Sequence, residues 1–174
     1  MLQHAESMAI GTPQRGERMA TAALQTDIGW IEVSADKDAI THLYWRGVQP
    51  QRLQSSPLVK EAVKQLQAYF EKRLTQFELP IVADGTGFAR DVWDVMLSIP
   101  YGKTLTYGDV ATRLNVPAQA VGQACGQNPI AIVIPCHRII GTNWLGGYSS
   151  ELGINAKEYL LDLERGHLRP ICDG

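Results

Sequence analysis

Residues 128–141 read Asn128-Pro129-Ile130-Ala131-Ile132-Val133-Ile134-Pro135-Cys136-His137-Arg138-Ile139-Ile140-Gly141. In this stretch an apolar run, residues 130–134, leads to a cysteine that is followed at once by a histidine and an arginine. The run is typical of a buried strand, so Cys136 would lie at the end of that strand. The thiolate is the reactive form of cysteine, and a neighbouring imidazole or cation is the usual means of populating it near neutral pH. Taken alone, the pattern is as typical of a cysteine that is a small buried core residue as of a nucleophilic cysteine.

Two short helices are predicted just before this stretch, over residues 107–114 and 118–126, with a tight turn between them. This arrangement is a helix-turn-helix unit, which also occurs in many proteins that do not bind DNA. The outer face of the second helix carries small and polar side chains: Ala118, Gln119 and Gln123. Such side chains would suit the minor groove of DNA, which is about 6 Å wide. A longer helix is predicted over residues 88–98.

The first half of the chain has a different pattern. Three strands are predicted, the first two joined by a tight turn: residues 21–25, 30–34 and 40–45. Pro57 opens an amphipathic helix that is predicted to end near Leu74. The turn-rich residues 84–87 mark a domain boundary. We therefore expect a flexible N-terminal tail, an N-terminal α/β domain and a C-terminal domain that holds the cysteine: residues 1–19, 20–84 and 85–174.

Composition narrows the classes of function. The chain has 174 residues, of which 45% are hydrophobic, as is ordinary for a globular protein. No apolar run approaches the ~20 residues that cross a bilayer, and the first 19 residues lack the apolar centre of a secretory signal. The three cysteines do not form a disulfide framework, so a cytoplasmic location is expected. A net charge of −2 gives no support to nucleic-acid binding.

Residues 128–141 closely resemble the active-site signature of the O6-alkylguanine-DNA alkyltransferases, the methylated-DNA–protein-cysteine methyltransferases. Upstream residues are similar to the pattern that precedes the cysteine in that family: Phe88, Val92, Trp93, Ile99, Pro100, Gly102, Tyr107 and Ala111. Downstream residues are similar to its closing elements: Gly147, Tyr148, Ser149, Lys157, Leu160, Leu161 and Glu164. The resemblance covers about half of the chain, in the family's order.

The resemblance implies a fold and an activity. The fold would be α/β (α+β), with a small, ribonuclease H-like N-terminal sheet and helix, and a C-terminal helical, winged-helix-like domain with the helix-turn-helix. The activity would be direct-reversal DNA repair, in which the alkyl group of O6-alkylguanine, or of O4-alkylthymine, moves irreversibly to Cys136 in a single turnover. The expected partner is double-stranded DNA that carries the alkylated guanine. No cofactor, metal or membrane is expected, and a monomer is expected. Two alternatives remain: a non-catalytic lesion-sensing or regulatory DNA-binding protein, and a Cys-His hydrolase.

The resemblance also implies a role for each site residue. Cys136 would accept the alkyl group, His137 would act as a base through a bridging water, and Glu164 would orient the imidazole. Four residues would bind the substrate or support its site: Tyr107, Asn128, Tyr148 and Ser149. Four would contact DNA: Tyr107, Ala118, Gln119 and Arg138. Without the resemblance, Glu164 would be interpreted as a solvated carboxylate at a helix end.

The chain departs from the family pattern at two positions. Gln119 stands immediately before Ala120, where most family members carry an arginine, and Gln127 stands where an arginine is common. Two missing cations remove two potential phosphate or stacking contacts, so DNA affinity should fall by about tenfold or more. Some family members hold a structural zinc in the N-terminal domain. No cysteine precedes Cys125 in this chain, so that site is absent.

Overall fold

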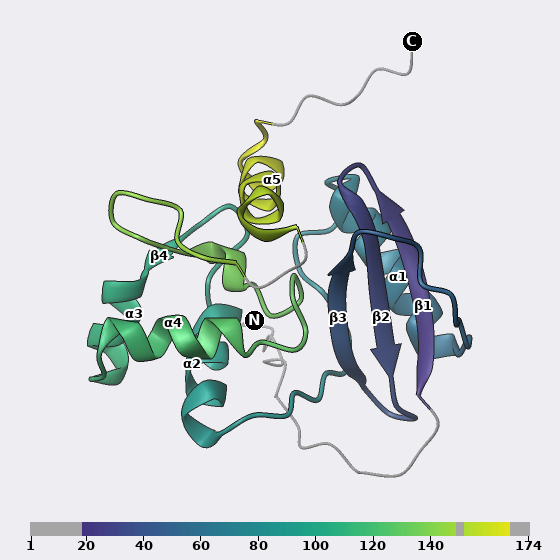
Figure 1. Cartoon of the computed structure of the whole chain (residues 1–174), viewed down its shortest axis with the longest axis horizontal. Helices are drawn as coiled ribbons and strands as arrows, with labels where there is room; N and C mark the ends of the chain where they lie inside the picture. Colours follow the sequence, from purple (N-terminus) through teal and green to yellow (C-terminus); the bar gives the residue numbers. More distant parts are fainter. Residues whose placement is uncertain (1–18, 149–151, 168–174) are drawn as a thin grey trace, which may run out of the picture.

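The computed structural model describes residues 19–148 and 152–167, which form a sheet-and-helix part and a helical part side by side (Figure 1). The predicted N-terminal tail, apart from Met19, lies outside the described residues, and so does Ser149. Among the described helices, none combines the length and apolar character needed to cross a membrane. The mixed α/β architecture agrees with the fold class expected from the sequence.

The N-terminal part is an antiparallel sheet with strand order β1-β2-β3. Its strands are β1 (Ala20–Thr26), β2 (Gly29–Ala35) and β3 (Ile40–Arg46). The hairpin between β1 and β2 closes at Gly29, whose φ of +135° is a conformation that favours glycine. Side chains alternate along the strands, so that Ile31, Val33 and Leu43 are buried on one face.

Helix α1 (Pro57–Phe70) covers that buried face of the sheet (Figure 1). The Ser56 hydroxyl caps its first turn by accepting a hydrogen bond from the Val59 amide at 3.4 Å. The helix ends four residues before the predicted Leu74. Lys72 adopts a left-handed conformation, and the amides of Arg73 and Leu74 both donate to the Ala68 carbonyl, which closes the helix there.

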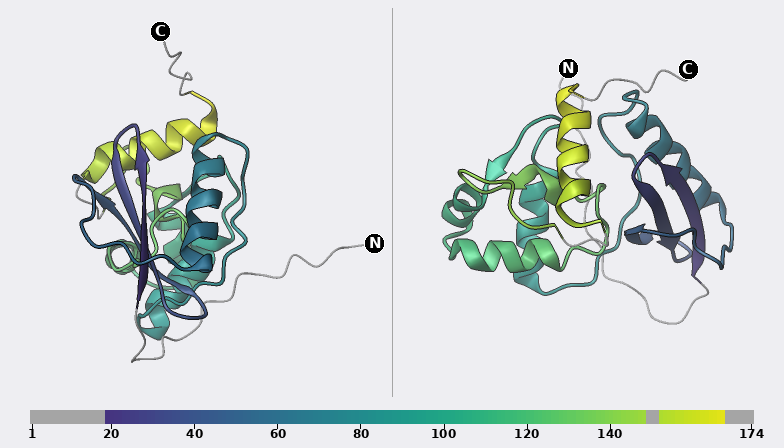
Figure 2. Two further views of the ribbon diagram at one scale, coloured as in Figure 1. Left: turned by 90° about the vertical axis from the view of Figure 1, so that its right-hand side faces the viewer. Right: turned by 45° about the horizontal axis from the view of Figure 1, so that its top comes forward.

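The helical part contains α2 (Gly87–Leu97), α3 (Tyr107–Leu114), α4 (Ala118–Gly126) and α5 (Gly153–Arg165). It also contains two short strands that pair in parallel, β4 (Leu105–Thr106) and β5 (Ile139–Ile140). A capping box between Thr106 and Asp109 starts α3, and Asn115 in a left-handed conformation ends it. Both predicted helices of the helix-turn-helix are therefore confirmed to the residue. Helix α5 lies between the helix-turn-helix and the N-terminal part (Figure 2).

The apolar residues 130–134 are not a strand, so that prediction is wrong. They form isolated bridges, Leu43 with Ile130 and Ala131 with Ile134, and Ile132 adopts a φ of +73°. The Asn128 side chain holds this turn by donating to the Ile134 carbonyl at 2.7 Å and accepting from the Ile130 amide at 3.0 Å. Cys136–Arg138 then forms one turn of 3-10 helix, η1, where an extended segment was expected.

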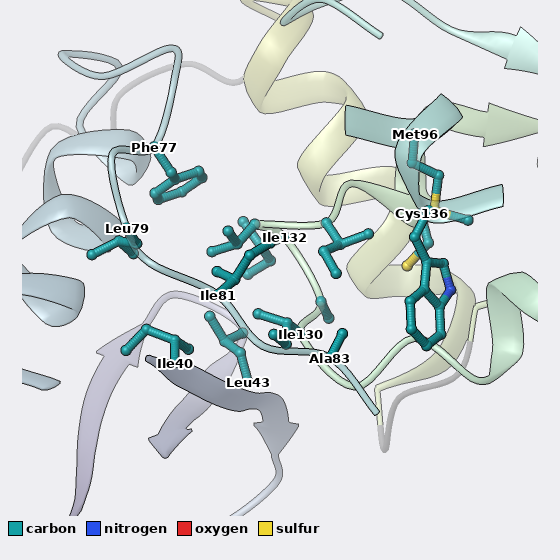
Figure 3. Close-up of a cluster of buried hydrophobic side chains, with 14 of the residues drawn as sticks. Ile40, Leu43, Phe77, Leu79, Ile81, Ala83, Met96, Ile130, Ile132 and Cys136 are labelled. Atoms are coloured by element: carbon teal, nitrogen blue, oxygen red, sulfur yellow. The ribbon is translucent and has the colours of Figure 1, made fainter. Parts of the chain in front are cut away.

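One hydrophobic core joins the two parts. Ile40 and Leu43 of β3 meet Ile81, Ile130 and Ile132, and all five are buried (Figure 3). Backbone hydrogen bonds from Leu43 to Pro129 (2.9 Å) and from Ala131 to Leu43 (3.3 Å) attach the turn before the cysteine to the edge of the sheet. The N-terminal sheet therefore helps to position the segment that carries Cys136.

Two neighbouring glycines of the predicted linker give a test of this packing. A Cβ atom on Gly85 would overlap the ring of Trp93, which is fully buried, whereas a Cβ atom on Gly87 would meet nothing. Gly85→Ala is therefore expected to lower the free energy of unfolding by about 1–3 kcal/mol. Gly87→Ala, in the first turn of α2, should leave it unchanged or raise it by about 1 kcal/mol at most. Urea unfolding of both variants checks the expectation, and equal stabilities would contradict the packing of Trp93 against this linker.

Candidate active site

Cys136 lies at the inner end of a cavity of about 730 Å³. One wall of the cavity comes from α3 and α4, and the other from the segment between β5 and α5. The lining residues are Tyr107, Gly108, Ala118, Gln119, Gly122, Gln123, Cys125, Gly126, Cys136, Gly141, Thr142, Trp144, Gly147 and Tyr148. Cys136 itself is only 8% exposed, and it begins the 3-10 turn η1, all three residues of which are buried. The thiol is thus almost fully covered by the protein, and it borders the cavity.

His137 is fully buried and paired with Glu164 of α5. Its Nε2 lies 2.6 Å from Glu164 Oε1. Burial opposes ionisation of Glu164, but His137 and Arg138 outweigh it and hold the carboxyl pKa well below its usual range. Burial lowers the pKa of His137, against the opposing effect of Glu164. A neutral imidazole beside an ionised carboxylate must carry its proton on Nε2, so Nδ1 keeps its lone pair.

Nδ1 of His137 is buried and has no hydrogen-bond partner among the described residues. A lone pair in this state is the acceptor that a general base requires. The structure thus brings the predicted Cys136, His137 and Glu164 together in one buried site. The interpretation of Glu164 as a solvated carboxylate is wrong, because its side chain is 1% exposed.

Arg138 is also part of this buried cluster. Its guanidinium donates to Glu164 through Nε, 3.0 Å from Oε2, and through Nη2, 3.0 Å from Oε1. Nη1 donates to the Ile99 carbonyl at 2.6 Å. The side chain is 9% exposed, so the cation is committed mainly to neutralising Glu164 inside the protein. The DNA contact expected of Arg138 stays a prediction.

Lys157 is a site residue to which the sequence reasoning assigned no role. It is fully buried, and its Nζ donates to the Ile139 carbonyl at 2.6 Å and to the Gly147 carbonyl at 3.1 Å. Burial raises the pKa of the Cys136 thiol, whereas Asn128, Lys157 and Tyr148 act in the opposite direction. The cation that favours the thiolate is therefore Lys157, not Arg138. The sequence does contain a signal for this role: Lys157 falls among the apolar positions of the segment that forms α5, where a charged residue is unusual.

Tyr107 stands at the mouth of the cavity, at the start of α3. Its hydroxyl accepts a hydrogen bond from Lys157 Nζ at 3.4 Å, and its ring stacks against Trp144 with a centroid separation of 6.3 Å. Burial, with smaller effects of Cys125 and Cys136, raises the pKa of Tyr107 to about 12, so the phenol stays protonated at neutral pH. Tyr148 lines the same cavity, and burial raises its pKa well above the usual value.

The remaining predicted residues divide into support and surface. The Asn128 side-chain amide is hydrogen-bonded to the backbone of the turn before Cys136, so Asn128 holds a supporting position in the site. Ala118 and Gln119 are exposed on α4 and line the cavity. Gln127 is exposed at the C-cap of the same helix. Ser149 lies outside the described residues, and within those residues no group of three His, Cys, Asp or Glu side chains could hold a metal ion.

Comparison with known proteins identifies the family. Residues 87–166 match the 6-O-methylguanine DNA methyltransferase DNA-binding domain, and residues 19–83 match its ribonuclease-like domain. Methylated-DNA–protein-cysteine methyltransferases from Methanosarcina barkeri (38% identical; 84% of this chain, 97% of the relative) and Mycobacterium tuberculosis (40%; 82% and 90%) are similar over most of their length.

Solved structures agree with the sequence matches. The crystal structure of M. tuberculosis O6-methylguanine methyltransferase has a TM-score of 0.76 and 37% identity, covering 87% of this chain and 96% of that one. The M. tuberculosis protein in complex with DNA has a TM-score of 0.74 and 38% identity, covering 85% and 92%. The expected small N-terminal sheet with a ribonuclease-like fold and the C-terminal DNA-binding domain are confirmed. The chain therefore belongs to the 6-O-methylguanine DNA methyltransferase family.

Proposed function

We propose that this protein repairs DNA by direct reversal, moving the alkyl group of O6-alkylguanine irreversibly to Cys136. The observation that carries the proposal is a buried thiol at the end of a cavity, beside a neutral imidazole whose tautomer is fixed by Glu164. Relatives named methylated-DNA–protein-cysteine methyltransferase, and a relative solved in complex with DNA, support the proposal. They also disfavour a non-catalytic lesion sensor and a hydrolase.

The proposed transfer needs no reactant besides the protein and the damaged base. The Cys136 proton passes to His137 Nδ1 through a bridging water, and the sulfur then attacks the alkyl carbon. The S–C bond forms as the C–O bond breaks, and the electron pair of that bond stays on the purine. The Tyr107 phenol donates a hydrogen bond to the departing base, and the thiol proton ends on the guanine. A thioether is too poor a leaving group for water to reverse the step, so each molecule acts once.

The substrate must leave the duplex to reach the sulfur, at a cost of a few kcal/mol of unstacking. Ala118 and Gln119 on α4, with Tyr107, are the DNA contacts of the proposal, and Tyr148 and Ser149 contact the purine. Asn128 supports the turn that carries Cys136. We extend the proposal to O4-alkylthymine, to a monomer acting on double-stranded DNA and to a cytoplasmic location. The domain boundaries at residues 19–20 and 84–85 belong to the same proposal.

The adduct is the direct test of this function. Incubation with an oligonucleotide that carries O6-methylguanine should add one methyl group per molecule, located by peptide mapping on Cys136. Cys136→Ser should gain none, because it lacks the acceptor sulfur, and Cys125→Ser should react like the unaltered protein. Intact-mass spectrometry over time measures the result. Repeated turnover, or a methyl group on Cys125 or Cys172, would overturn the mechanism.

A second test concerns orientation of the imidazole. Glu164→Gln is expected to slow transfer by about 10²–10⁴ at neutral pH, because an amide does not impose the Nε2–H tautomer on His137. DNA binding, measured separately, should change far less. The variant also leaves the buried Arg138 without a counter-ion, at a cost of about 3–5 kcal/mol of stability.

Tyr69→Phe is the matched control for that loss of stability. The Tyr69 hydroxyl donates to the same Glu164 oxygen at 2.7 Å, so its removal should cost about 1.5–3 kcal/mol while the His137–Glu164 pair remains. Single-turnover rates and urea unfolding of both variants separate the two effects. If Tyr69→Phe slowed transfer as much as Glu164→Gln, lost stability would explain the result and imidazole orientation would not.

A third test uses pH. Lys157 favours the Cys136 thiolate, so Lys157→Met should raise the pKa of Cys136 further. The transfer rate rises with pH as the Cys136 thiol ionises. The pH at which this alkaline rise is half complete should then increase, and the rate at pH 7 should fall. The acid limb is set by protonation of His137, whose pKa lies below its ordinary value of 6.5 mainly because of burial, with Lys157 as the smallest lowering influence. It should therefore move only slightly, toward higher pH, and far less than the alkaline limb. Single-turnover rates from about pH 5 to about pH 10 measure both limbs. An unmoved alkaline limb would remove Lys157 from thiolate stabilisation.

A further inference from the structure

Trp144 differs from the other tryptophans of the chain. It is 66% exposed, whereas Trp45 and Trp93 are buried and Trp30 is partly covered. A single exposed apolar side chain is ordinary on a protein surface. Trp144, however, is also a lining residue of the cavity that ends at Cys136. Its exposed area therefore faces the route by which a substrate reaches the sulfur.

The indole is held in place by two neighbours. Its ring is stacked on Tyr107, with an interplanar angle of 22°. Gly141 makes room for it, because a Cβ atom there would overlap Nε1 and neighbouring ring atoms of the indole. Gly141 does not have the positive φ that would itself require glycine, so the close approach of the indole is the physical reason for a glycine at this position. Trp144 is thus pre-organised with part of its ring open to the cavity.

The residues of α3 and α4 that line the cavity offer little else to hold a nucleic acid, because none of them is charged. Helix α4 spans Ala118–Gly126 and contains no charged residue. The two cations of the active site are buried, and Arg138 is committed to Glu164 while Lys157 is committed to backbone carbonyls. Affinity for an extruded nucleotide therefore has to come mainly from shape and stacking. Stacking of a base on an aromatic side chain needs no charge and tolerates any base, because every base has a π-face.

We propose that Trp144 is a substrate-binding residue, whose indole stacks on the extruded alkylated purine as it occupies the cavity. The inference rests on the proposed alkyl transfer to Cys136 and adds an aromatic contact to it. An indole has no group that donates or accepts the transferred atoms, so its contribution is to binding and not to the rate of the chemical step. Free O6-benzylguanine, which contains the same purine, should use the contact as duplex DNA does.

The experiment compares Trp144→Ala and Trp144→Phe in single-turnover reactions with free O6-benzylguanine and with O6-methylguanine duplex. For Trp144→Ala, the substrate concentration at half-maximal rate should rise about tenfold or more with both substrates, while the maximal rate constant stays within about threefold. Trp144→Phe, which keeps an aromatic face, should recover part of the affinity. An effect confined to the duplex would place the contact on flanking DNA, and no effect on either substrate would remove it; each result overturns the proposal.

A binding measurement makes the test independent of chemistry. In unreactive Cys136→Ser protein, O6-benzylguanine should quench tryptophan fluorescence, and Trp144→Phe added to that protein should abolish the quenching. Trp30→Phe, on β2, is the matched control and should leave the quenching intact. If unaltered protein formed no adduct on Cys136, the proposed function itself would fail. If the adduct formed but quenching survived Trp144→Phe, only the stacking inference would fail.

Discussion

The Glu164 carboxylate is the interaction on which the rest of this structure depends. It is buried, and it accepts hydrogen bonds from Tyr69 of α1, the Gly102 amide, His137 and Arg138. A buried charge is tolerated only when donors surround it, so these donors have to meet at one point. Because Tyr69 belongs to the N-terminal part and Glu164 to the last helix, the same carboxylate joins the two parts and sets the tautomer of the imidazole.

Burial of the Cys136 thiol has two effects: it makes the thiol hard to ionise, and it protects the thiol from reagents in the solvent. Cys136 is almost inaccessible outside its cavity, and burial raises the pKa of its thiol. A protonated thiol reacts slowly with solvent oxidants and free electrophiles, which suits a residue that can act only once. In the proposed transfer, His137 Nδ1 accepts the thiol proton and Lys157 supplies positive charge that favours the thiolate. Reactivity is thus confined to a substrate that can enter the cavity.

The surface that would meet DNA is built with little positive charge. Helix α4 has small and polar side chains, the two cations near the sulfur are internal, and the chain as a whole carries a net charge of −2. Electrostatic affinity for phosphates is therefore modest, and fewer counterions are released on binding. Shape and aromatic contact gain importance in such an interface, and the Tyr107–Trp144 pair is the aromatic surface that the structure places at the cavity mouth.

Local chemistry determined much of this protein from sequence alone. The Thr106–Asp109 capping box, the left-handed Asn115 and the alternating strands specify their elements through neighbouring residues, so α3, α4 and the sheet were predictable. The conformation of residues 130–134 was not predictable in this way. An apolar run of this length is typical of a strand, but the hydrogen bonds of Asn128 and the left-handed Ile132 bend it into a turn. The resemblance to the alkyltransferase family predicted that Cys136, His137 and Glu164 belong to one site. Only the tertiary structure decided that Arg138 neutralises Glu164 and that Lys157 is buried where its charge favours the Cys136 thiolate, because burial and pairing of a charge depend on partners far away in the chain.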